Sequence, residues 1–400
     1  MTTTAQDMKT MNRELLGELL GEIVRDAKSG GPKIRIGLMS VGSEHEHDDD
    51  RGQGELLDGA LAAERADRSL EVVMIGPRIL KRAETETLPW IETPDCEADI
   101  VNALNAAIQS KEVAGAVALH YPFPVGVATV GRVITPLKGR PMLIASTTGT
   151  TATDRVEAMM RNAVCGVAVA KSLGIETPTV GILNVDGASS VARQLGKLKD
   201  AGCNIRFGES VRKDGGSVLR GNDLLAGAVD VCVTDTLTGN VLMKLFSSWN
   251  NGGTCETTGY GYGPSVGEGW DKTISIISRA SGSPVIANAL AYTAEVVRGS
   301  LTANVAKEFQ AANKAGFQAL STPQEKAKGN KEAAATHPPA EPTDEELHGV
   351  DVLAINEATQ ALWAKGIYAE ASMGCTGPVV KVPAKHAERA GEILKEEGFL

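Results

Sequence analysis

Short aliphatic runs alternate with helix-length segments over most of the chain. The runs are rich in Val, Ile and Leu, and they span 34–39, 71–76, 115–119, 141–145, 179–185, 229–235 and 284–290. Aliphatic runs of this length, separated by segments with helical spacing, are typical of βαβ units. We therefore predict an α/β fold with a doubly wound, largely parallel sheet covered by helices on both faces. Ligands of such sheets bind at the carboxyl ends of the strands.

The pattern divides the chain into four parts. Residues 1–30 hold apolar positions at helical spacing, which predicts an N-terminal helix packed on the body or on a second subunit. Residues 31–320 form the α/β body. Residues 321–349 are rich in Pro, Lys, Glu and Ala and lack an apolar stripe, which is typical of a linker or an exposed loop. Residues 350–400 form a small C-terminal unit.

The C-terminal unit is predicted to contain a helix over 357–370, a turn, a strand over 379–382 and a final helix. Cys375 lies in the turn, in the sequence MGCTGP. Its flanking glycines, Gly374 and Gly377, permit unusual backbone angles and close approach of another molecule. A thiolate is both a nucleophile and a good leaving group, so Cys375 can carry an acyl group as a thioester. The alternative is a small residue that fills a turn, and the residues alone leave both open.

A second candidate site follows the run at 229–235. Backbone amides at a glycine turn that opens a helix can hold an anion, and hydroxyls or a lysine can assist them. The residues of this site are Asp235, Thr238, Gly239, Asn240 and, about one turn further on, Lys244. Asp, Thr and Asn also cap ordinary helices. An anion site and a plain helix cap are therefore equal alternatives at this point.

Two further loops after strands hold polar side chains. The segment 146–151 contains Thr147 and Thr148, which can contact phosphate or an acyl carbonyl, although an ordinary turn is favoured for the segment taken alone. The segment 42–50 contains His45 and His47 among several carboxylates. His45 is a candidate acid, base or substrate contact at a strand end. We favour a solvated loop over a metal site for these histidines and predict no bound metal.

Composition and charge narrow the classes of function. Lys and Arg total 40 and Asp and Glu total 50, so the net charge is 40 − 50 = −10. An acidic chain without a basic run is a poor candidate for binding nucleic acid or an anionic membrane.

The six cysteines form no CxxC pair, which favours reduced thiols over disulfides or a zinc site. With no secretory signal and no long apolar stretch, a cytoplasmic protein is expected. The five cysteines other than Cys375 are interpreted as structural.

A nicotinamide cofactor is not supported. The glycine-dense segment 259–269 lacks the GxGxxG pattern between a strand and a helix. A mobile loop over a site is the preferred interpretation of this segment, and a surface loop is the alternative. We expect phosphate as a co-substrate and no other cofactor.

Two segments in the middle of the chain resemble a known family. The runs VEAMMRNAVCGVAVAKSLGIETPTVGILNVDG at 156–187 and VDVCVTDTLTGNVLMK at 229–244 are similar to the phosphate acyltransferases of fatty acid and phospholipid synthesis. The resemblance spans about 140–290, and more weakly from residue 34. It implies a phosphate acyltransferase-like fold, related to isopropylmalate dehydrogenase. The chain departs from that family in GSEHEH at 42–47 and in VGVATVGR at 125–132.

Those departures lead to a closer resemblance. GSEHEH, together with NEATQALWAKGIYAEASMGCTGPVV at 356–380, resembles the alpha subunits of component C of glycine/sarcosine/betaine reductases. That family implies that a carboxymethyl group arrives on selenoprotein A, that an acetyl thioester forms on Cys375, and that phosphate releases acetyl phosphate. It also implies a component C beta subunit as partner, in a homo- or hetero-oligomer. Backbone amides from Gly374 through Thr376 to Gly377, or the Asn240 side chain, are candidate oxyanion donors.

Three other functions stay open from the sequence. A fatty acyl-carrier-protein:phosphate acyltransferase requires a long apolar tunnel and no covalent intermediate. A non-catalytic scaffolding subunit would use its N-terminal helix and acidic surface to dock a partner enzyme. A metal-dependent decarboxylating dehydrogenase of related topology is the most distant, because the cofactor loop is missing.

Overall fold

A computed structural model describes residues 33–41, 49–80, 83, 86–213, 215–321, 338–350, 354–374 and 377–400. The chain forms two compact units, each built from separate stretches of sequence. Unit 1 comprises Met1–Pro122, Lys244–Ser265 and Lys272–Arg298. Unit 2 comprises Phe123–Met243, Val266–Asp271 and Gly299–Leu400. The predicted N-terminal helix lies outside the described residues, and the predicted body of 31–320 belongs to both units.

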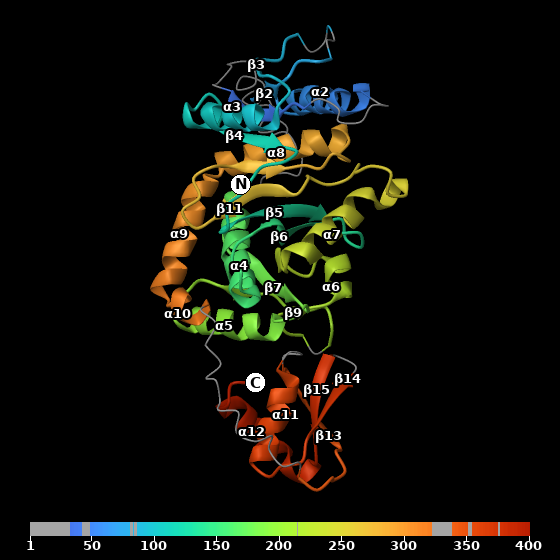
Figure 1. Cartoon of the computed structure of the whole chain (residues 1–400), viewed down its shortest axis with the longest axis vertical. Coiled ribbons are helices and arrows are strands. Elements are labelled where there is room, and N and C mark those ends of the chain that lie inside the picture. Colours follow the sequence, from blue (N-terminus) through green and yellow to red (C-terminus); the bar gives the residue numbers. More distant parts are fainter. Residues whose placement is uncertain are drawn as a thin grey trace, which may run out of the picture. The chain divides into compact units, whose positions relative to one another are not determined.

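Unit 1 is built on a mostly parallel sheet with the strand order β3-β2-β1-β4-β12-β11. Figure 1 labels β2, β3, β4 and β11 of this sheet. Every pair from β3 to β12 is parallel, and β11 runs antiparallel to β12. The strands are β1 (Ile34–Met39), β2 (Leu70–Gly76), β3 (Trp90–Glu92), β4 (Gly115–Ala118), β11 (Gly263–Gly267) and β12 (Ile274–Ile276).

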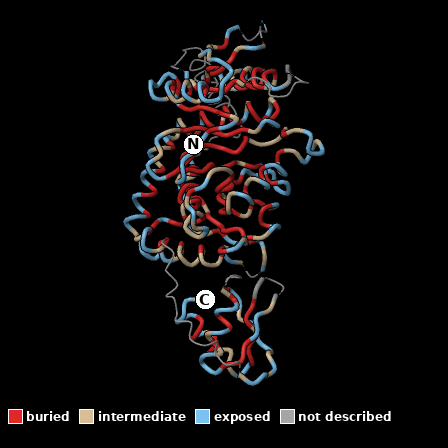
Figure 2. The backbone as a smooth tube through the Cα atoms, in the orientation of Figure 1, coloured by how far each residue is buried: buried red, intermediate tan, exposed pale blue. Residues whose placement is uncertain are grey.

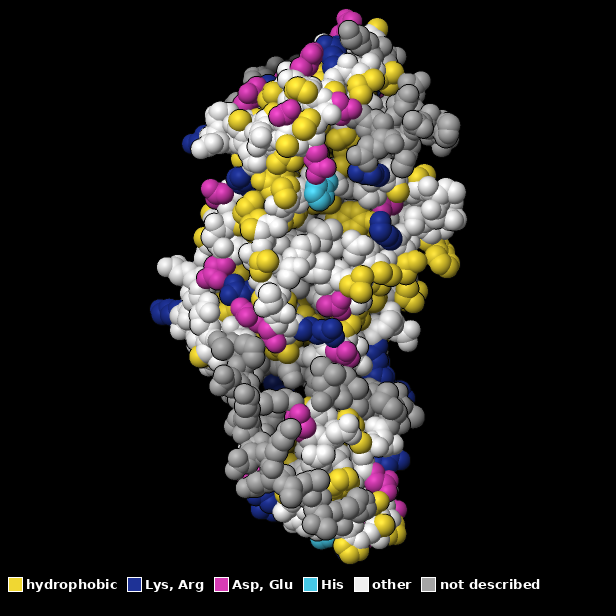
Figure 3. All heavy atoms as spheres, viewed as in Figure 1, with side chains coloured by type: hydrophobic (Ala, Val, Ile, Leu, Met, Phe, Trp, Pro, Cys, Tyr) yellow, Lys and Arg dark blue, Asp and Glu magenta, His cyan; other side chains and the backbone are white. Residues whose placement is uncertain are grey.

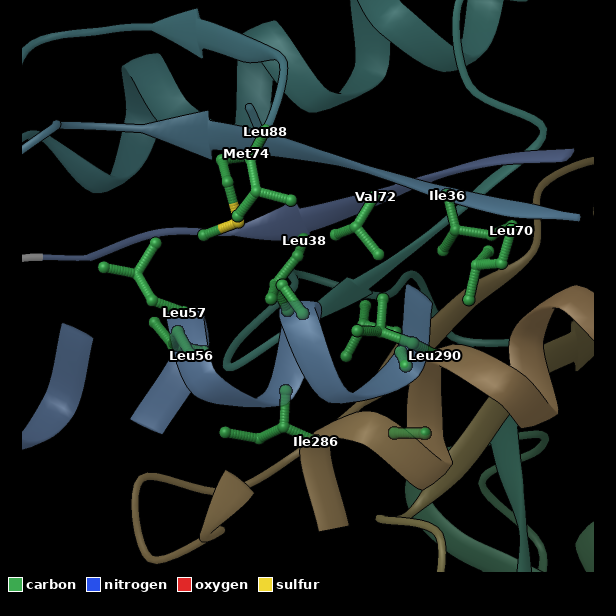
Figure 4. Packing of buried hydrophobic residues seen from close by; sticks show 14 of the residues in the cluster. Ile36, Leu38, Leu56, Leu57, Leu70, Val72, Met74, Leu88, Ile286 and Leu290 are labelled. Carbon is green, nitrogen blue, oxygen red and sulfur yellow. The ribbon is translucent and has the colours of Figure 1, made fainter. Parts of the chain in front are cut away.

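Helices cover both faces of this sheet. The helices of unit 1 are α2 (Asp49–Ala66), α3 (Glu97–Gln109) and α8 (Ser283–Arg298). Alternate residues of β1 and β2 point into one core, where Leu56 and Leu57 of α2 meet Ile286 and Leu290 of α8 (Figure 4). The buried residues of α3, among them Leu104, belong to no part of that core. The strands are therefore buried from both sides, as Figure 2 shows, and the doubly wound fold is confirmed.

The strands of unit 2 have the order β5-β6-β10-β7-β8, with β9 paired to β7. The pairs from β6 to β8 are parallel, whereas β5 and β6 form an antiparallel pair. The strands are β5 (Val127–Ile134), β6 (Pro141–Thr150), β7 (Thr179–Leu183), β8 (Arg206–Phe207), β9 (Val218–Leu219) and β10 (Val231–Val233). The helices are α4 (Arg155–Ser172), α5 (Ala188–Asp200), α6 (Gly221–Ala226), α9 (Leu301–Lys314) and α10 (Phe317–Ser321). Helix α7 (Thr236–Ser248) begins in unit 2, and its residues from Lys244 onward belong to unit 1.

The C-terminal segment of unit 2 has a small core of its own. A three-stranded antiparallel sheet with the order β13-β15-β14 packs against two helices. The elements are β13 (Glu345–His348), α11 (Ile355–Ala364), β14 (Glu370–Gly374), β15 (Gly377–Val382) and α12 (Ala387–Glu396). The core includes Leu362, Val380 and Leu394, all 0% exposed.

Six of the seven predicted runs form or contain strands, and the exception is informative. Residues 284–290 belong to α8, because their apolar positions continue at helical spacing through Val296. The predicted hydroxyl loop at 146–151 is strand up to Thr150, since β6 continues beyond the aliphatic run. The predicted mobile loop at 259–269 contains β11, whose five residues are all buried.

Two predictions about the C-terminal unit need correction as well. The helix predicted over 357–370 ends at Ala364, and Gly366 follows with a φ of 76° that only glycine adopts readily. The segments that flank Cys375 in the sequence are therefore two antiparallel strands, β14 and β15, and not a helix and a strand. Within the predicted linker, Glu345–His348 forms β13 and pairs with β15. Among the described residues, no helix is long and apolar enough to cross a membrane.

We expect Leu57→Ala to lower the free energy of unfolding by about 2–5 kcal/mol, because it opens a cavity in the α2–α8 core. Leu57 is 0% exposed, whereas Ile79 is 53% exposed. Native-state hydrogen exchange of the amides of β1 and β2 measures the change. Ile79→Ala is the control and should leave those amides protected; an equal loss in both variants would contradict the packing described here.

Candidate functional site

The start of α7 is capped by the residue that precedes it. One carboxylate oxygen of Asp235 accepts a hydrogen bond from the backbone N–H of Thr238 at 3.0 Å, and the other accepts from the Thr238 hydroxyl at 2.7 Å. A carboxylate at a helix N-terminus satisfies unpaired amides and interacts favourably with the helix dipole. The capping alternative therefore accounts for the mutual contacts of Asp235 and Thr238.

The next turn of α7 lies directly against β6, at Ser146 and Thr147. A Cβ atom built on Gly239 would lie 1.8 Å from the carbonyl oxygen of Ser146, so any larger residue would have to displace backbone. The side-chain amide of Asn240 donates to the carbonyl oxygen of Thr147 at 3.1 Å. The structure thus brings together three of the predicted residues, Gly239, Asn240 and Thr147, in one small region of unit 2.

Hydroxyl groups fill the space around this contact. The Thr129 hydroxyl lies 2.7 Å from the hydroxyls of both Thr147 and Thr148, and Ser146 Oγ lies 2.7 Å from Thr236 Oγ1. Thr129, Ser146 and Thr147 are fully buried, while Thr148, Thr236 and Asn240 are half-buried. Only the half-buried side chains remain accessible to a ligand without a change of structure.

Asn162 of α4 hydrogen-bonds to three residues of this region. Its amide nitrogen donates to Ser146 Oγ at 3.2 Å and to the carbonyl oxygen of Thr234 at 3.1 Å, and its oxygen accepts from Thr151 Oγ1 at 2.8 Å. The sequence analysis did not predict Asn162 as a site residue. A lone amide side chain within the apolar run 156–170 could have indicated it, because a buried amide needs hydrogen-bond partners. Its position holds the ends of β6 and β10 in register.

Lys244 lies in the part of α7 that belongs to unit 1, and its partners belong to the same unit. Its ammonium donates to the Tyr262 hydroxyl at 3.0 Å and lies 3.8 Å from the buried carboxylate of Glu256. The Tyr262 hydroxyl donates to Glu256 at 2.7 Å, and Ser281 donates to the other carboxylate oxygen at 2.7 Å. Burial raises the pKa of Tyr262, and the bond to Glu256 raises it further, so the phenol stays protonated. Sequence patterns gave no indication of this buried carboxylate.

Three cysteines are unsuited to covalent chemistry. Cys165 and Cys232 are at most 1% exposed, and burial raises the pKa of each thiol to about 12. Burial also raises the pKa of Cys203. Since the thiolate is the reactive form, these residues are inert near neutral pH, which agrees with their interpretation as structural. Cys96 is exposed and Cys255 is half-buried.

Several predicted site residues lie outside the described residues: His45, Cys375 and Thr376. Their neighbours Gly374 and Gly377 are register partners at the ends of β14 and β15. The roles predicted for Cys375, for His45 and for the amides from Gly374 to Gly377 therefore stay predictions. Within the described part of the chain, no group of three His, Cys, Asp or Glu side chains is placed to hold a metal ion.

The fold and the start of α7 define a doubly wound α/β protein whose polar side chains gather where the start of α7 meets β6. The sequence profile of the family described as "Fatty acid synthesis protein" matches residues 30–381. The chain belongs to this family.

Two relatives support this family assignment. The chain is 44% identical over 392 residues to the glycine/sarcosine/betaine reductase complex component C subunit alpha of Peptoclostridium acidaminophilum, covering 97% of this chain and 99% of that protein. It is 27% identical over 244 residues to the phosphate acyltransferase of Thermotoga petrophila, covering 53% of this chain and 67% of that protein. Both resemblances predicted from the sequence are confirmed.

Among solved structures, a branched-chain phosphotransacylase from Enterococcus faecalis V583 aligns with a TM-score of 0.46 and 15% sequence identity. The alignment covers 66% of this chain and 99% of that one.

We expect Gly239→Ala to destabilise unit 2, because the added methyl group collides with the backbone of Ser146. A methyl group added at Gly196, inside α5, would meet no atom of a neighbouring element within 4 Å, so Gly196→Ala should be neutral or stabilise by about 0.4–1 kcal/mol. Thermal unfolding of both variants measures the difference. A Gly239→Ala variant as stable as Gly196→Ala would contradict the close approach of α7 to β6.

We expect Cys165 and Cys232 to resist iodoacetamide in the folded protein near pH 8. A thiol with a pKa of about 12 is ionised there to only about one part in ten thousand. Since burial raises these pKa values, reactivity should appear only at much higher pH or on unfolding. Mass spectrometry of tryptic peptides measures alkylation, with the exposed Cys96 as the reactive reference.

Proposed function

We propose that the chain is an acyltransferase subunit of a glycine/sarcosine/betaine reductase complex, which carries an acetyl group on Cys375 and releases it to phosphate as acetyl phosphate. The observation that carries this proposal is the 44% identity over 97% of the chain to a component C subunit alpha. That likeness extends over the C-terminal unit, where Cys375 lies. The cytoplasm is the proposed location, since the cysteines are free thiols wherever the structure describes them.

The proposed reaction is phosphorolysis of a thioester. A phosphate oxygen attacks the thioester carbonyl carbon, the new C–O bond forms, and the C–S bond breaks. The electron pair of that bond returns to Cys375 as a thiolate, ready for the next acetyl group. The burial of Cys165, Cys203 and Cys232 supports the choice of Cys375, because those three thiols are withdrawn from any substrate.

The start of α7 is the proposed phosphate site. Thr148, Thr236 and Asn240 are half-buried and offer hydroxyl and amide groups at this point. Asp235 contributes by capping the helix, because its negative charge would repel a phosphate placed directly against it. Thr147 and Gly239 position the strand and the helix, and Thr238 completes the cap. Lys244 is proposed to add positive charge further along α7, since its side chain is 55% exposed.

The proposed partners follow from the name of the relative. A subunit called alpha of component C implies a beta subunit and other components of the complex. In our proposal the acetyl group originates from a carboxymethyl group delivered by selenoprotein A. The C–Se bond breaks, the selenium is oxidised by two electrons and bonds to a thiol of selenoprotein A, and the carbon becomes a methyl group. The carboxyl group loses an oxygen as water when the thioester to Cys375 forms. The acidic net charge of −10 argues against a nucleic acid as a partner.

A long-chain acyl-carrier-protein:phosphate acyltransferase is the second candidate. The observation in its favour is the similarity to phosphate acyltransferases, such as that of Thermotoga petrophila over 53% of this chain. This reaction transfers the acyl group directly to phosphate and has no role for Cys375.

The deciding experiment maps acetylation after incubation of the purified chain with acetyl phosphate. We expect mass spectrometry to find a hydroxylamine-sensitive acetyl group on the peptide that contains Cys375. Cys375→Ala should abolish both the labelling and the arsenate-dependent breakdown of acetyl phosphate. Cys96→Ala, which removes an exposed thiol elsewhere, should retain both.

Other outcomes point elsewhere. Full activity in Cys375→Ala would remove the thioester from the mechanism. Formation of acyl phosphate from long-chain acyl-carrier protein, without labelling of Cys375, would favour the second candidate. A chain that neither binds phosphate nor becomes acetylated, alone or with its partners, would favour the scaffolding function.

A further inference from the structure

Tyr262 lies between a lysine and a buried carboxylate. Its hydroxyl accepts a hydrogen bond from the Lys244 ammonium at 3.0 Å and donates one to Glu256 Oε1 at 2.7 Å. The ammonium nitrogen and Glu256 Oε1 are 3.8 Å apart, whereas a direct charge-assisted hydrogen bond would bring them to about 2.7–2.9 Å. The phenol therefore keeps Lys244 out of direct contact with the opposite charge.

The chemistry of the three groups fixes the direction of these hydrogen bonds. An ammonium only donates, a carboxylate only accepts, and a protonated phenol has a single hydrogen to donate. Burial raises the pKa of Tyr262, and the bond to Glu256 raises it further, so the phenol keeps that hydrogen. Tyr262 gives its hydrogen to Glu256, and its oxygen accepts from Lys244. The bonds thus form one chain from the ammonium to the carboxylate.

Glu256 is anchored through its side chain and its backbone. Ser281 Oγ donates to Glu256 Oε2 at 2.7 Å. The backbone N–H of Glu256 donates to the carbonyl oxygen of Ala280 at 2.8 Å, and the N–H of Gly282 donates to the carbonyl oxygen of Glu256 at 2.9 Å. Glu256 is 2% exposed and Tyr262 is 3% exposed. Because both residues are enclosed, the Tyr262 hydroxyl is a fixed acceptor for Lys244.

Lys244 keeps donor capacity for a ligand. Its side chain is 55% exposed, and its ammonium lies 5.4 Å from the centre of the Tyr262 ring, within the range of a cation–π contact. Within the described residues the ammonium donates one hydrogen bond, so two of its three N–H groups remain for an acceptor. A lysine has a flexible stem that loses rotational freedom when it binds an anion. A lysine held in place beforehand loses less of that freedom on binding.

The placement of a single lysine matters because basic groups are dispersed. On the face drawn in Figure 3, the Lys and Arg side chains of the described residues are scattered among acidic ones and form no broad basic surface. The one charged residue of α7 is Lys244. It follows Asn240 by four positions, so the two side chains lie on the same side of the helix, one turn apart.

We infer that Tyr262 is a positioning residue for phosphate binding, whose hydroxyl, fixed by Glu256, holds the Lys244 ammonium ready for an anion. This inference rests on the proposed phosphate site at the start of α7. Without the hydroxyl, the ammonium can close on Glu256 as a direct ion pair, and less positive charge is offered to phosphate. The negative charge of Glu256 itself opposes an incoming phosphate. The phenol and the carboxylate therefore have opposite effects on phosphate affinity.

Isothermal titration calorimetry of the full-length chain with inorganic phosphate, at constant ionic strength, tests the inference. We expect Tyr262→Phe, which keeps the ring, to raise the Kd for phosphate about 10-fold, as when an untethered lysine has to be ordered on binding. Lys244→Ala should raise the Kd at least as much. Adding Tyr262→Phe to Lys244→Ala should then change it by less than about twofold, because the phenol acts only through that lysine.

The matched control is Tyr260→Phe, which removes a phenol hydroxyl two positions away in the sequence. The Tyr260 ring packs edge-on against Tyr292 at 6.0 Å, and the variant keeps that ring. We expect it to bind phosphate like the wild type. Thermal unfolding of every variant verifies that it is folded before its Kd is compared.

Glu256→Gln separates the positioning of Lys244 from a general loss of structure. The variant keeps an oxygen that can accept from Tyr262 and removes the negative charge, so the Kd for phosphate should fall about threefold or more. A purely structural role for the three groups would instead weaken phosphate binding in both Tyr262→Phe and Glu256→Gln.

Unchanged phosphate affinity in Tyr262→Phe, additive losses in the double variant, or weaker binding in Glu256→Gln would overturn the inference. A wild-type chain that binds no phosphate would overturn it together with the proposed phosphate site. The expected affinities combined with no acetyl group on Cys375 would support the role of Tyr262 and refute the thioester mechanism.

Discussion

The contact between Gly239 and the carbonyl oxygen of Ser146 is the constraint on which the candidate site depends. No side chain larger than hydrogen fits between them. Because the helix approaches the strand so closely, Asn240 can reach the carbonyl of Thr147, and Thr236 can reach the hydroxyl of Ser146. A single missing Cβ atom therefore determines which polar groups face one another where α7 meets β6.

The close approach of α7 to β6 buries backbone and side-chain polar groups, and these groups need hydrogen-bond partners. The Thr129 hydroxyl bonds to the hydroxyls of Thr147 and Thr148, and Asn162 links Ser146 to the carbonyl of Thr234, directly after β10. A buried network of this kind is rigid only when its members have partners. Rigid placement is what an anion site needs, because preorganised donors cost no reorganisation when charge arrives.

The sequence predicted those features that depend on local pattern. Aliphatic runs predicted six strands because a strand buried on both faces must be apolar throughout. The same rule failed at 284–290, where a buried helix is equally apolar over a short window. It also failed to extend β6 through Ser146–Thr150, because hydroxyl residues resemble a turn unless the partner strand β5 is known. The bond from Asp235 to Thr238 was foreseeable as a cap, whereas Glu256 meets Lys244 only through the tertiary fold.

One face of α7 is buried and the opposite face is exposed, and on each face the residues recur every four positions. Gly239 and Met243 are buried on one face, and Val241 and Leu245 are exposed on the other. A helix packed this closely cannot rotate its exposed side chains into the core. It can move only as a rigid element. Any displacement of α7 would therefore reach Asn240 through the helix backbone. Thermodynamic linkage then requires that a phosphate and any partner that favour the same position of α7 strengthen each other's binding by the same factor.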